Sequence, residues 1–150
     1  DNRTDYIKRV IGLPGDKIKI VNGEIYLNNN IVARKKMKDF IDRDNNSNIK
    51  RARKYREYFG NLTFDVLDIM DNGIVDNTEL FNVPEGYFFV MGDNRDNSQD
   101  SRFKTVGFIP INKLVGKARF IFFSLENSRF LEIWKWPKAI RGSRIFSTIK

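Results

Sequence analysis

Residues 17–27 read Lys-Ile-Lys-Ile-Val-Asn-Gly-Glu-Ile-Tyr-Leu. Apolar residues alternate with polar ones on both sides of Asn22-Gly23, and Asn-Gly is the strongest short signal for a two-residue hairpin turn. With a loop of that length Ile20 lies opposite Ile25, so the apolar side chains of the two strands share one face. The stretch therefore predicts an antiparallel β-hairpin.

The rest of the chain follows the same β pattern. Turn signals recur about every 8 to 12 residues, which is typical of an antiparallel, mainly β fold. Strands are expected over Tyr6–Ile11, Leu62–Met70, Tyr87–Met91 and Lys113–Ser124, with Ile74-Val75 as the start of a further strand. Leu13-Pro14-Gly15-Asp16 predicts a type II turn, because Pro presets one central residue and Gly supplies the positive φ of the next.

A charged segment interrupts this pattern. Residues 31–73 are interpreted as an inserted subdomain, and residues 1–30 and 74–150 as the β core. Within the insertion, Asp44–Asn48 is expected to be a loop or a disordered bridge, and Ile49–Phe59 a short basic helix. The predicted fold is thus mainly β with a basic, partly helical or disordered insertion.

Composition excludes several kinds of chemistry. The 150 residues include no cysteine and no histidine, and 27 basic residues against 19 acidic ones leave a net charge of +8. A disulfide, a thiolate site, a Ser-His-Asp triad and a histidine-ligated metal are therefore excluded, and no cofactor is expected. A general base must be a carboxylate, a lysine or a tyrosine. Apolar runs fall far short of the roughly 20 residues that span a bilayer.

The stretch with the most chemical content is Gly-Asp-Asn-Arg-Asp-Asn-Ser-Gln-Asp-Ser-Arg, residues 92–102, directly after the apolar run that ends at Met91. A surface turn needs only one or two such polar residues. Arg95 and Arg102 can each bind a carboxylate through two hydrogen bonds and so hold the loop in one shape. A polar surface loop is the plain alternative, but a rigid loop can position a hydroxyl.

A calcium site is an alternative for this loop, and its spacing is wrong. An EF-hand loop needs Gly at its sixth position and Glu at its twelfth. Counted from Asp96, these positions hold Ser101 and Gly107.

Gly92–Arg102 resembles the most diagnostic motif of the bacterial type I signal peptidases, and Lys8–Asp16 resembles the motif that carries their lysine. The resemblance extends through Asp76–Thr78, Val83–Gly86 and Val115–Ala118 in the family's order, and so covers most of the chain. It implies a membrane-bound serine endopeptidase that removes signal peptides from exported proteins, with its catalytic domain on the outer, periplasmic face of the cytoplasmic membrane.

The resemblance implies specific roles. The general base falls on Lys8 and the hydroxyl that orients it on Ser98. The supporting ion-pair residues are Asp93, Arg95, Asp100 and Arg102, and Tyr6 and Ile7 line the substrate pocket. A lysine acts as a base only when it is neutral, and burial favours the neutral form; the apolar neighbours Tyr6, Ile7, Val10 and Ile11 are expected to supply that burial. Strand alternation directs Arg9 away from Lys8.

One part of the family pattern does not occur. The resemblance places the nucleophile in a Ser-Met-x-Pro motif upstream of the lysine, and this sequence contains no Ser-Met pair. The chain is therefore expected to be the carboxyl-terminal part of a catalytic domain, soluble and inactive on its own.

A binding module is the alternative function. Ten basic and four acidic residues occur between Arg34 and Glu57, with Tyr55, Tyr58 and Phe59 beside them. Basic residues interleaved with aromatic ones can bind single-stranded nucleic acid. The peptidase interpretation expects no nucleic acid.

The carboxyl-terminal segment suggests a further partner. Trp134, Trp136 and Phe146 lie among Lys135, Lys138, Arg141 and Arg144. Such residues can contact anionic lipid headgroups. A terminal strand packed on the core is the alternative for the same residues.

Overall fold

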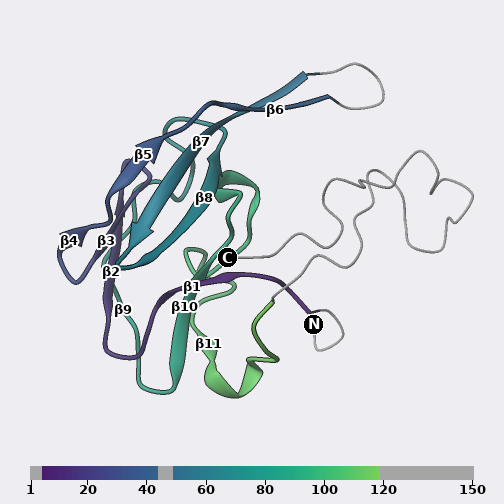
Figure 1. The fold of residues 1–150 in the computed structure, drawn as a ribbon. Coiled ribbons are helices and arrows are strands. Elements are labelled where there is room, and N and C mark those ends of the chain that lie inside the picture. Colours follow the sequence, from purple (N-terminus) through teal and green to yellow (C-terminus); the bar gives the residue numbers. More distant parts are fainter. Residues whose placement is uncertain (1–4, 44–48, 119–150) are drawn as a thin grey trace, which may run out of the picture. The chain divides into compact units, whose positions relative to one another are not determined.

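The computed structural model describes residues 5–43 and 49–118, which confirm the mainly β, antiparallel fold (Figure 1). Asp1–Val115 form one compact unit and Gly116–Lys150 a second. The strands are β1 (Arg9–Gly12), β2 (Lys17–Val21), β3 (Glu24–Leu27), β4 (Asn30–Ile31), β5 (Arg34–Lys36), β6 (Phe40–Arg43), β7 (Ile49–Phe59), β8 (Leu62–Asp68), β9 (Phe81–Asn82), β10 (Tyr87–Met91) and β11 (Ile109–Pro110). Two 3-10 helices, η1 (Arg95–Asn97) and η2 (Ile111–Lys113), lie among them.

The predicted hairpin is present in the predicted register. Ile20 of β2 pairs with Ile25 of β3. Asn22 and Gly23 have φ angles of 49° and 74°, as a type I′ turn requires. The type II turn before β2 is also present, because the N–H of Asp16 donates to the carbonyl of Leu13 and Gly15 has a φ of 84°.

Residues 76–78 hold the hairpin from outside its sheet. The N–H of Ile20 donates to Thr78 Oγ1 at 3.0 Å, and the N–H of Asn22 donates to Asn77 Oδ1 at 3.0 Å. The N–H of Gly23 donates to the carbonyl of Asp76 at 3.0 Å. Through these three hydrogen bonds, residues 76–78 hold the turn of the hairpin in place.

Residues 49–59 are a strand, so the prediction of a basic helix is wrong. β7 pairs with β5, β6 and β8, and pairs with β8 from Arg53↔Asp68 to Phe59↔Leu62. The side chains of β7 therefore alternate between the two faces of a sheet. Long-range pairing with acidic residues of β8 outweighs the local preference of Lys and Arg for helix. The expected loop at residues 44–48 lies outside the described residues.

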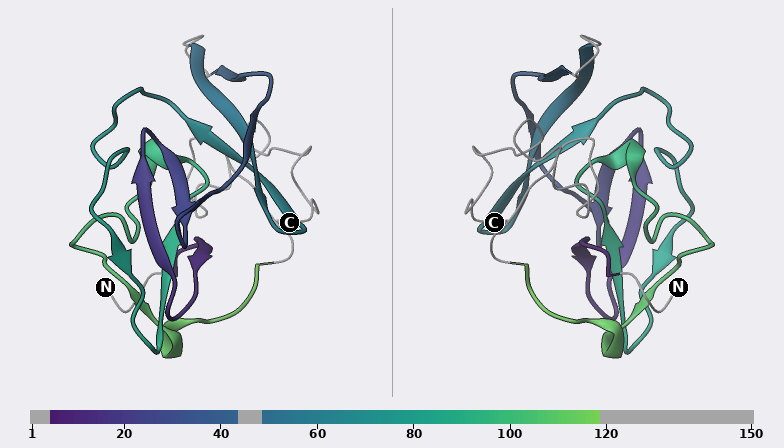
Figure 2. Two further views of the ribbon diagram at one scale, coloured as in Figure 1. Left: turned by 90° about the vertical axis from the view of Figure 1, so that its left-hand side faces the viewer. Right: turned by 90° about the vertical axis from the view of Figure 1, so that its right-hand side faces the viewer.

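The core joins strands from all parts of the described unit. Ile18, Ile25, Phe64 and Phe89 belong to one buried hydrophobic cluster. Phe64 comes from β8, within the proposed insertion, so the two proposed parts share a core; the division into core and insertion stays a prediction. Figure 2 shows the β7–β8 ribbon beside the β2–β3 hairpin.

The sheet β1-β10-β11 carries the polar loop. β10 confirms the strand predicted at Tyr87–Met91, and its last three residues are buried. β1 begins at Arg9 rather than Tyr6, and Ile74-Val75 lies in a turn rather than a strand. A strand was predicted at 113–124, but Lys113 is the last residue of a 3-10 helix that directly follows β11. Residues 114–118 are irregular, and the remainder of the predicted strand lies outside the described residues. Among residues 5–43 and 49–118, no helix has the length and apolar character needed to cross a bilayer.

Candidate active site

Lys8 and Ser98 form the centre of the site. Lys8 lies immediately before β1 and Ser98 immediately after η1, and pairing of β1 with β10 brings these distant segments together. The Lys8 Nζ donates to Ser98 Oγ at 2.6 Å. Ser98 is buried and Lys8 is partly buried. The structure thus brings together the two residues to which the resemblance assigns catalysis.

Gly92 makes this approach possible. It follows β10, and a Cβ atom built there would lie 2.2 Å from Ser98 Oγ and 3.5 Å from Lys8 Nζ. The first distance is far below any non-bonded contact. A side chain at position 92 would therefore displace the Ser98 hydroxyl from Lys8.

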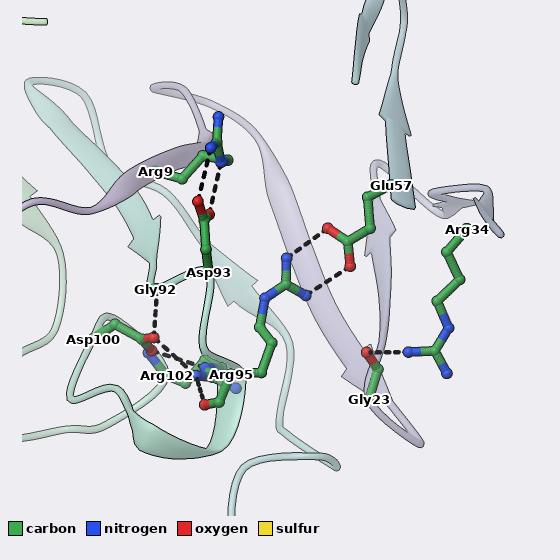
Figure 3. Close-up of polar contacts among 9 residues, drawn as sticks. All are labelled: Arg9, Gly23, Arg34, Glu57, Gly92, Asp93, Arg95, Asp100 and Arg102. Carbon is green, nitrogen blue, oxygen red and sulfur yellow. Dashed lines mark hydrogen bonds and ion pairs between the residues drawn. The ribbon is translucent and has the colours of Figure 1, made fainter. Parts of the chain in front are cut away.

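Asp100 and Arg102, at the end of the Gly92–Arg102 loop, form a buried ion pair (Figure 3). Arg102 Nε and Nη2 each donate to one oxygen of Asp100, both at 2.8 Å. The exposed fractions of the two residues are 0% and 5%. Asp100 Oδ2 also accepts the N–H of Gly92 at 2.9 Å. The predicted two-point contact of Arg102 is confirmed.

The pKa of Asp100 depends on its neighbours, and Ser98 is one of them. Burial by itself would raise the pKa of Asp100, but the hydrogen bonds and the charge of Arg102, the N–H of Gly92 and the side chain of Ser98 outweigh it, so the pKa lies below its ordinary value. Asp100 is therefore a carboxylate whose negative charge lies beside the Ser98 side chain.

Two further two-point contacts hold the loop from outside. Arg9 Nε and Nη2 donate to Asp93 at 2.8 Å each, and the Arg9 guanidinium lies 3.8 Å from the centre of the Phe64 ring. Arg9 and its neighbour Lys8 therefore bind different partners. Arg95 donates to Glu57 of β7 at 2.8 and 2.5 Å. Figure 3 shows both pairs.

Glu57 was missed at the level of sequence. The two-point contact expected for Arg95 is present, but the acid comes from β7 rather than from the loop itself. The available signal was a single acid in the basic run 49–59. Strand alternation in this run places Glu57 on the same side as Tyr55 and Phe59.

The apolar neighbours of Lys8 are not arranged as expected. Tyr6 and Ile7 are 71% and 76% exposed, and Val10 is also exposed. They precede or begin β1, and only Ile11 turns its side chain into the core. The expectation that these neighbours bury Lys8 is wrong for the described residues. The assignment of Tyr6 and Ile7 to a substrate pocket stays a prediction.

The basic segment is largely paired within the protein. Arg51 pairs with Asp39, Arg53 with Asp68, and both Lys54 and Arg56 with Asp65. Arg53 also contacts Asp71. Such pairs reduce the positive charge available to phosphates, which counts against the alternative of a nucleic-acid-binding module. The tryptophans proposed to contact lipid lie outside the described residues.

The chain is similar to known signal peptidases. The family described as signal peptidase, peptidase S26 matches residues 1–123, so the chain belongs to that family. A signal peptidase I of Rickettsia typhi is 36% identical over 99% of this chain and 61% of its own length. One of Rickettsia bellii is 36% identical over 97% of this chain and 55% of its own length.

A crystal structure of a signal peptidase I from Enterococcus faecalis V583 is 25% identical, with a TM-score of 0.39, over 73% of this chain and 78% of that one. The chain spans about three-fifths of the length of the Rickettsia typhi relative.

Proposed function

We propose that this chain supplies the lysine base and the orienting serine of a bacterial endopeptidase that removes signal peptides from exported proteins. The observation that carries the proposal is the 2.6 Å hydrogen bond from Lys8 Nζ to Ser98 Oγ. Two side chains 90 positions apart in the sequence meet at a short hydrogen-bond distance. The buried ion pair under Ser98 supports a positioned hydroxyl rather than a turn cap.

In the proposed reaction, the neutral amine of Lys8 accepts the proton of a serine hydroxyl as its oxygen bonds to the scissile carbonyl carbon. Lys8, now an ammonium, gives this proton to the leaving nitrogen as the carbon–nitrogen bond breaks. The hydroxyl of Ser98 orients Lys8 Nζ towards the nucleophile, and Asp100 fixes the position of the Ser98 hydroxyl. Tyr6 and Ile7 lie just before the base and are proposed to contact the signal peptide.

The nucleophilic serine is proposed to come from a Ser-Met-x-Pro segment that precedes the lysine motif in the family. This sequence contains no Ser-Met pair. The 150-residue polypeptide by itself is therefore proposed to leave signal peptides uncut. The site of action is proposed to be the outer face of the cytoplasmic membrane, with signal peptides as substrates and anionic lipid as a further contact.

A chimera tests this function. The 150 residues are joined behind the segment that precedes the matched region in the Rickettsia typhi relative, and cleavage of a signal-peptide substrate is measured by mass spectrometry. The joined protein should cleave the substrate and the 150-residue chain should not. Lys8→Ala should lower kcat by at least about 100-fold, the lower range for a general base, and Ser98→Ala should lower it by less.

Asp65→Asn is the matched control. Asp65 pairs with Arg56 and Lys54. Among the described residues, Asp65 forms no hydrogen bond with Lys8 or Ser98. Its kcat should equal that of the parent protein. Cleavage that persists in Lys8→Ala would refute the proposal.

A further inference from the structure

Glu57 is a buried acid near the end of β7, outside every motif that resembles the signal peptidases. Its exposed fraction is 1%, and that of its partner Arg95 is 6%. A buried charge persists only when it is paired and hydrogen-bonded. Glu57 meets this condition through Arg95, whose Nη1 and Nη2 donate to Oε1 at 2.8 Å and to Oε2 at 2.5 Å.

Glu57 sets the orientation of the Arg95 guanidinium. Within residues 5–43 and 49–118, Arg95 Nε is buried without a hydrogen-bond partner. Among the described residues, the Arg95 side chain donates its two hydrogen bonds to Glu57. A planar guanidinium held at two points on one side has little freedom to rotate. The position of Arg95 therefore depends on a residue of the neighbouring sheet.

Arg95 connects to Ser98 by two routes. Along the chain, Arg95 is the first residue of η1, and Ser98 directly follows the last. Through space, the carbonyl of Arg95 accepts Arg102 Nη2 at 2.5 Å, and Arg102 in turn holds Asp100. Asp100 accepts the N–H of Gly92, against which Ser98 packs. Figure 3 shows this succession from Glu57 to Gly92.

We infer that Glu57 is a positioning residue for the Lys8–Ser98 pair. It holds Arg95, and through Arg95 it fixes the 3-10 turn and the Arg102–Asp100 pair that place the Ser98 hydroxyl. Its effect on peptide cleavage rests on the proposed function, whereas its effect on the Lys8–Ser98 hydrogen bond does not. The alternative is that Glu57 only neutralises a buried charge and so contributes to stability alone.

Two variants separate these roles. Glu57→Asp keeps the charge but withdraws the carboxylate by one methylene, so positioning is lost while neutralisation is kept. Glu57→Gln keeps the length but removes the charge. Asp65→Asn is the control, because it also removes a carboxylate that pairs with an arginine across β7 and β8. Among the described residues, its ion-pair partners Arg56 and Lys54 form no ion pair with the Gly92–Arg102 loop.

The first readout is the ammonium group of Lys8 in the 150-residue chain with ¹⁵N-labelled lysine, assigned by its loss in Lys8→Arg. Its proton exchange with water should be at least about fivefold faster in Glu57→Asp, the factor that corresponds to one typical net hydrogen bond. Asp65→Asn should leave exchange unchanged. A change below twofold in Glu57→Asp, in a protein whose circular dichroism equals that of the parent, would overturn the inference.

Glu57→Gln keeps the test decisive if Glu57→Asp does not fold. Positioning predicts faster Lys8 exchange in Glu57→Gln too, at a temperature where the variant is folded. Unchanged exchange there assigns Glu57 to stability alone and overturns the inference.

The second readout is kcat in the joined protein described under the proposed function. Displacement of a reacting group by about 1 Å can cost about 100-fold, so Glu57→Asp should lower kcat by at least about 10-fold, with KM within twofold. If the Lys8→Ala protein cleaves the substrate normally while Glu57→Asp still speeds the proton exchange of the Lys8 ammonium group with water, the proposed function fails and the positioning role stands. If Lys8→Ala is inactive while Glu57→Asp changes neither exchange nor kcat, the positioning role fails alone.

Discussion

Two regions of this protein contain the same kind of aspartate–arginine ion pair, which is buried in one region and partly exposed in the other. The Gly92–Arg102 loop contains Asp100–Arg102, whose side chains are 0% and 1% exposed. The β7–β8 ribbon contains Asp65–Arg56, whose side chains are 29% and 41% exposed. Both are two-point contacts between a carboxylate and a guanidinium.

Burial decides what each pair does. In the ribbon, water can replace either partner, so the pairs mainly reduce the positive charge of a basic surface. In the loop, no water replaces a lost partner, and each group must keep its position. The comparison shows that pairing by itself does not mark a functional site; pairing away from water, beside a hydroxyl and an amine, does.

The largest expected difference between the regions comes from removal of one carboxylate in each. Asp100→Asn should lower the free energy of unfolding by about 3 to 5 kcal/mol, because it leaves the charge of Arg102 buried and uncompensated. Asp65→Asn should lower it by less than about 1 kcal/mol. Urea unfolding of the 150-residue chain measures both. Equal losses would show that burial does not separate the two regions.

A steric change gives the next effect. Gly92→Ala should lower the free energy of unfolding by about 1 to 3 kcal/mol, as overpacking does, because its Cβ would overlap Ser98 Oγ. Among the described residues, none lies within 4 Å of a Cβ atom built at Gly116, so Gly116→Ala should stay within about 0.5 kcal/mol. In Gly92→Ala the Lys8 ammonium should also exchange faster with water. Normal exchange in this variant would contradict the close packing of Gly92 on Ser98.

Acid should affect both regions with the same sign. Hydrogen bonds from Arg56 and Lys54 outweigh burial and lower the pKa of Asp65 from 3.8 to about 2, and the pKa of Asp100 is also lowered. A carboxyl that is more acidic in the folded state contributes stability above its unfolded pKa, about 3.9, and loses it as pH falls towards its folded pKa. Stability should therefore fall from about pH 4 towards pH 2.

The size of this loss distinguishes the two carboxyls. Asp100→Asn should flatten the fall in stability more than Asp65→Asn, because solvent screens Asp65. Urea midpoints between pH 5 and 2 measure it. A steeper contribution from Asp65 would reverse the comparison.

The smallest effect should come from the basic ribbon as a nucleic-acid ligand. Substitution of Lys50, Arg51, Arg53 and Lys54 by Gln should hardly change retention of an oligonucleotide at physiological salt, because carboxylates of the protein already pair with three of these residues. Retention with a steep salt dependence that the variant abolishes would support a nucleic-acid-binding module instead.

Local patterns predicted the elements whose information is local. The hairpin at Asn22-Gly23 and the turn at Gly15 were predicted with register and turn type, because a tight turn permits few backbone conformations. β7 was misread because a run of Lys and Arg is compatible with a helix, and only its partners β5, β6 and β8 select the strand. Lys8 and Ser98 were found through the resemblance, and their spacing alone would not have joined them.

The sequence by itself determined the mainly β class, the absence of histidine and cysteine chemistry, and the family motifs, since residue types and short-range patterns carry that information. Only the tertiary structure decided that Glu57 pairs with Arg95 and that Tyr6 and Ile7 are exposed. The physical reason is that burial and ion pairing depend on distance through space. The contact from Glu57 to Arg95 spans 38 residues and that from Lys8 to Ser98 spans 90, so only the folded arrangement of strands determines them.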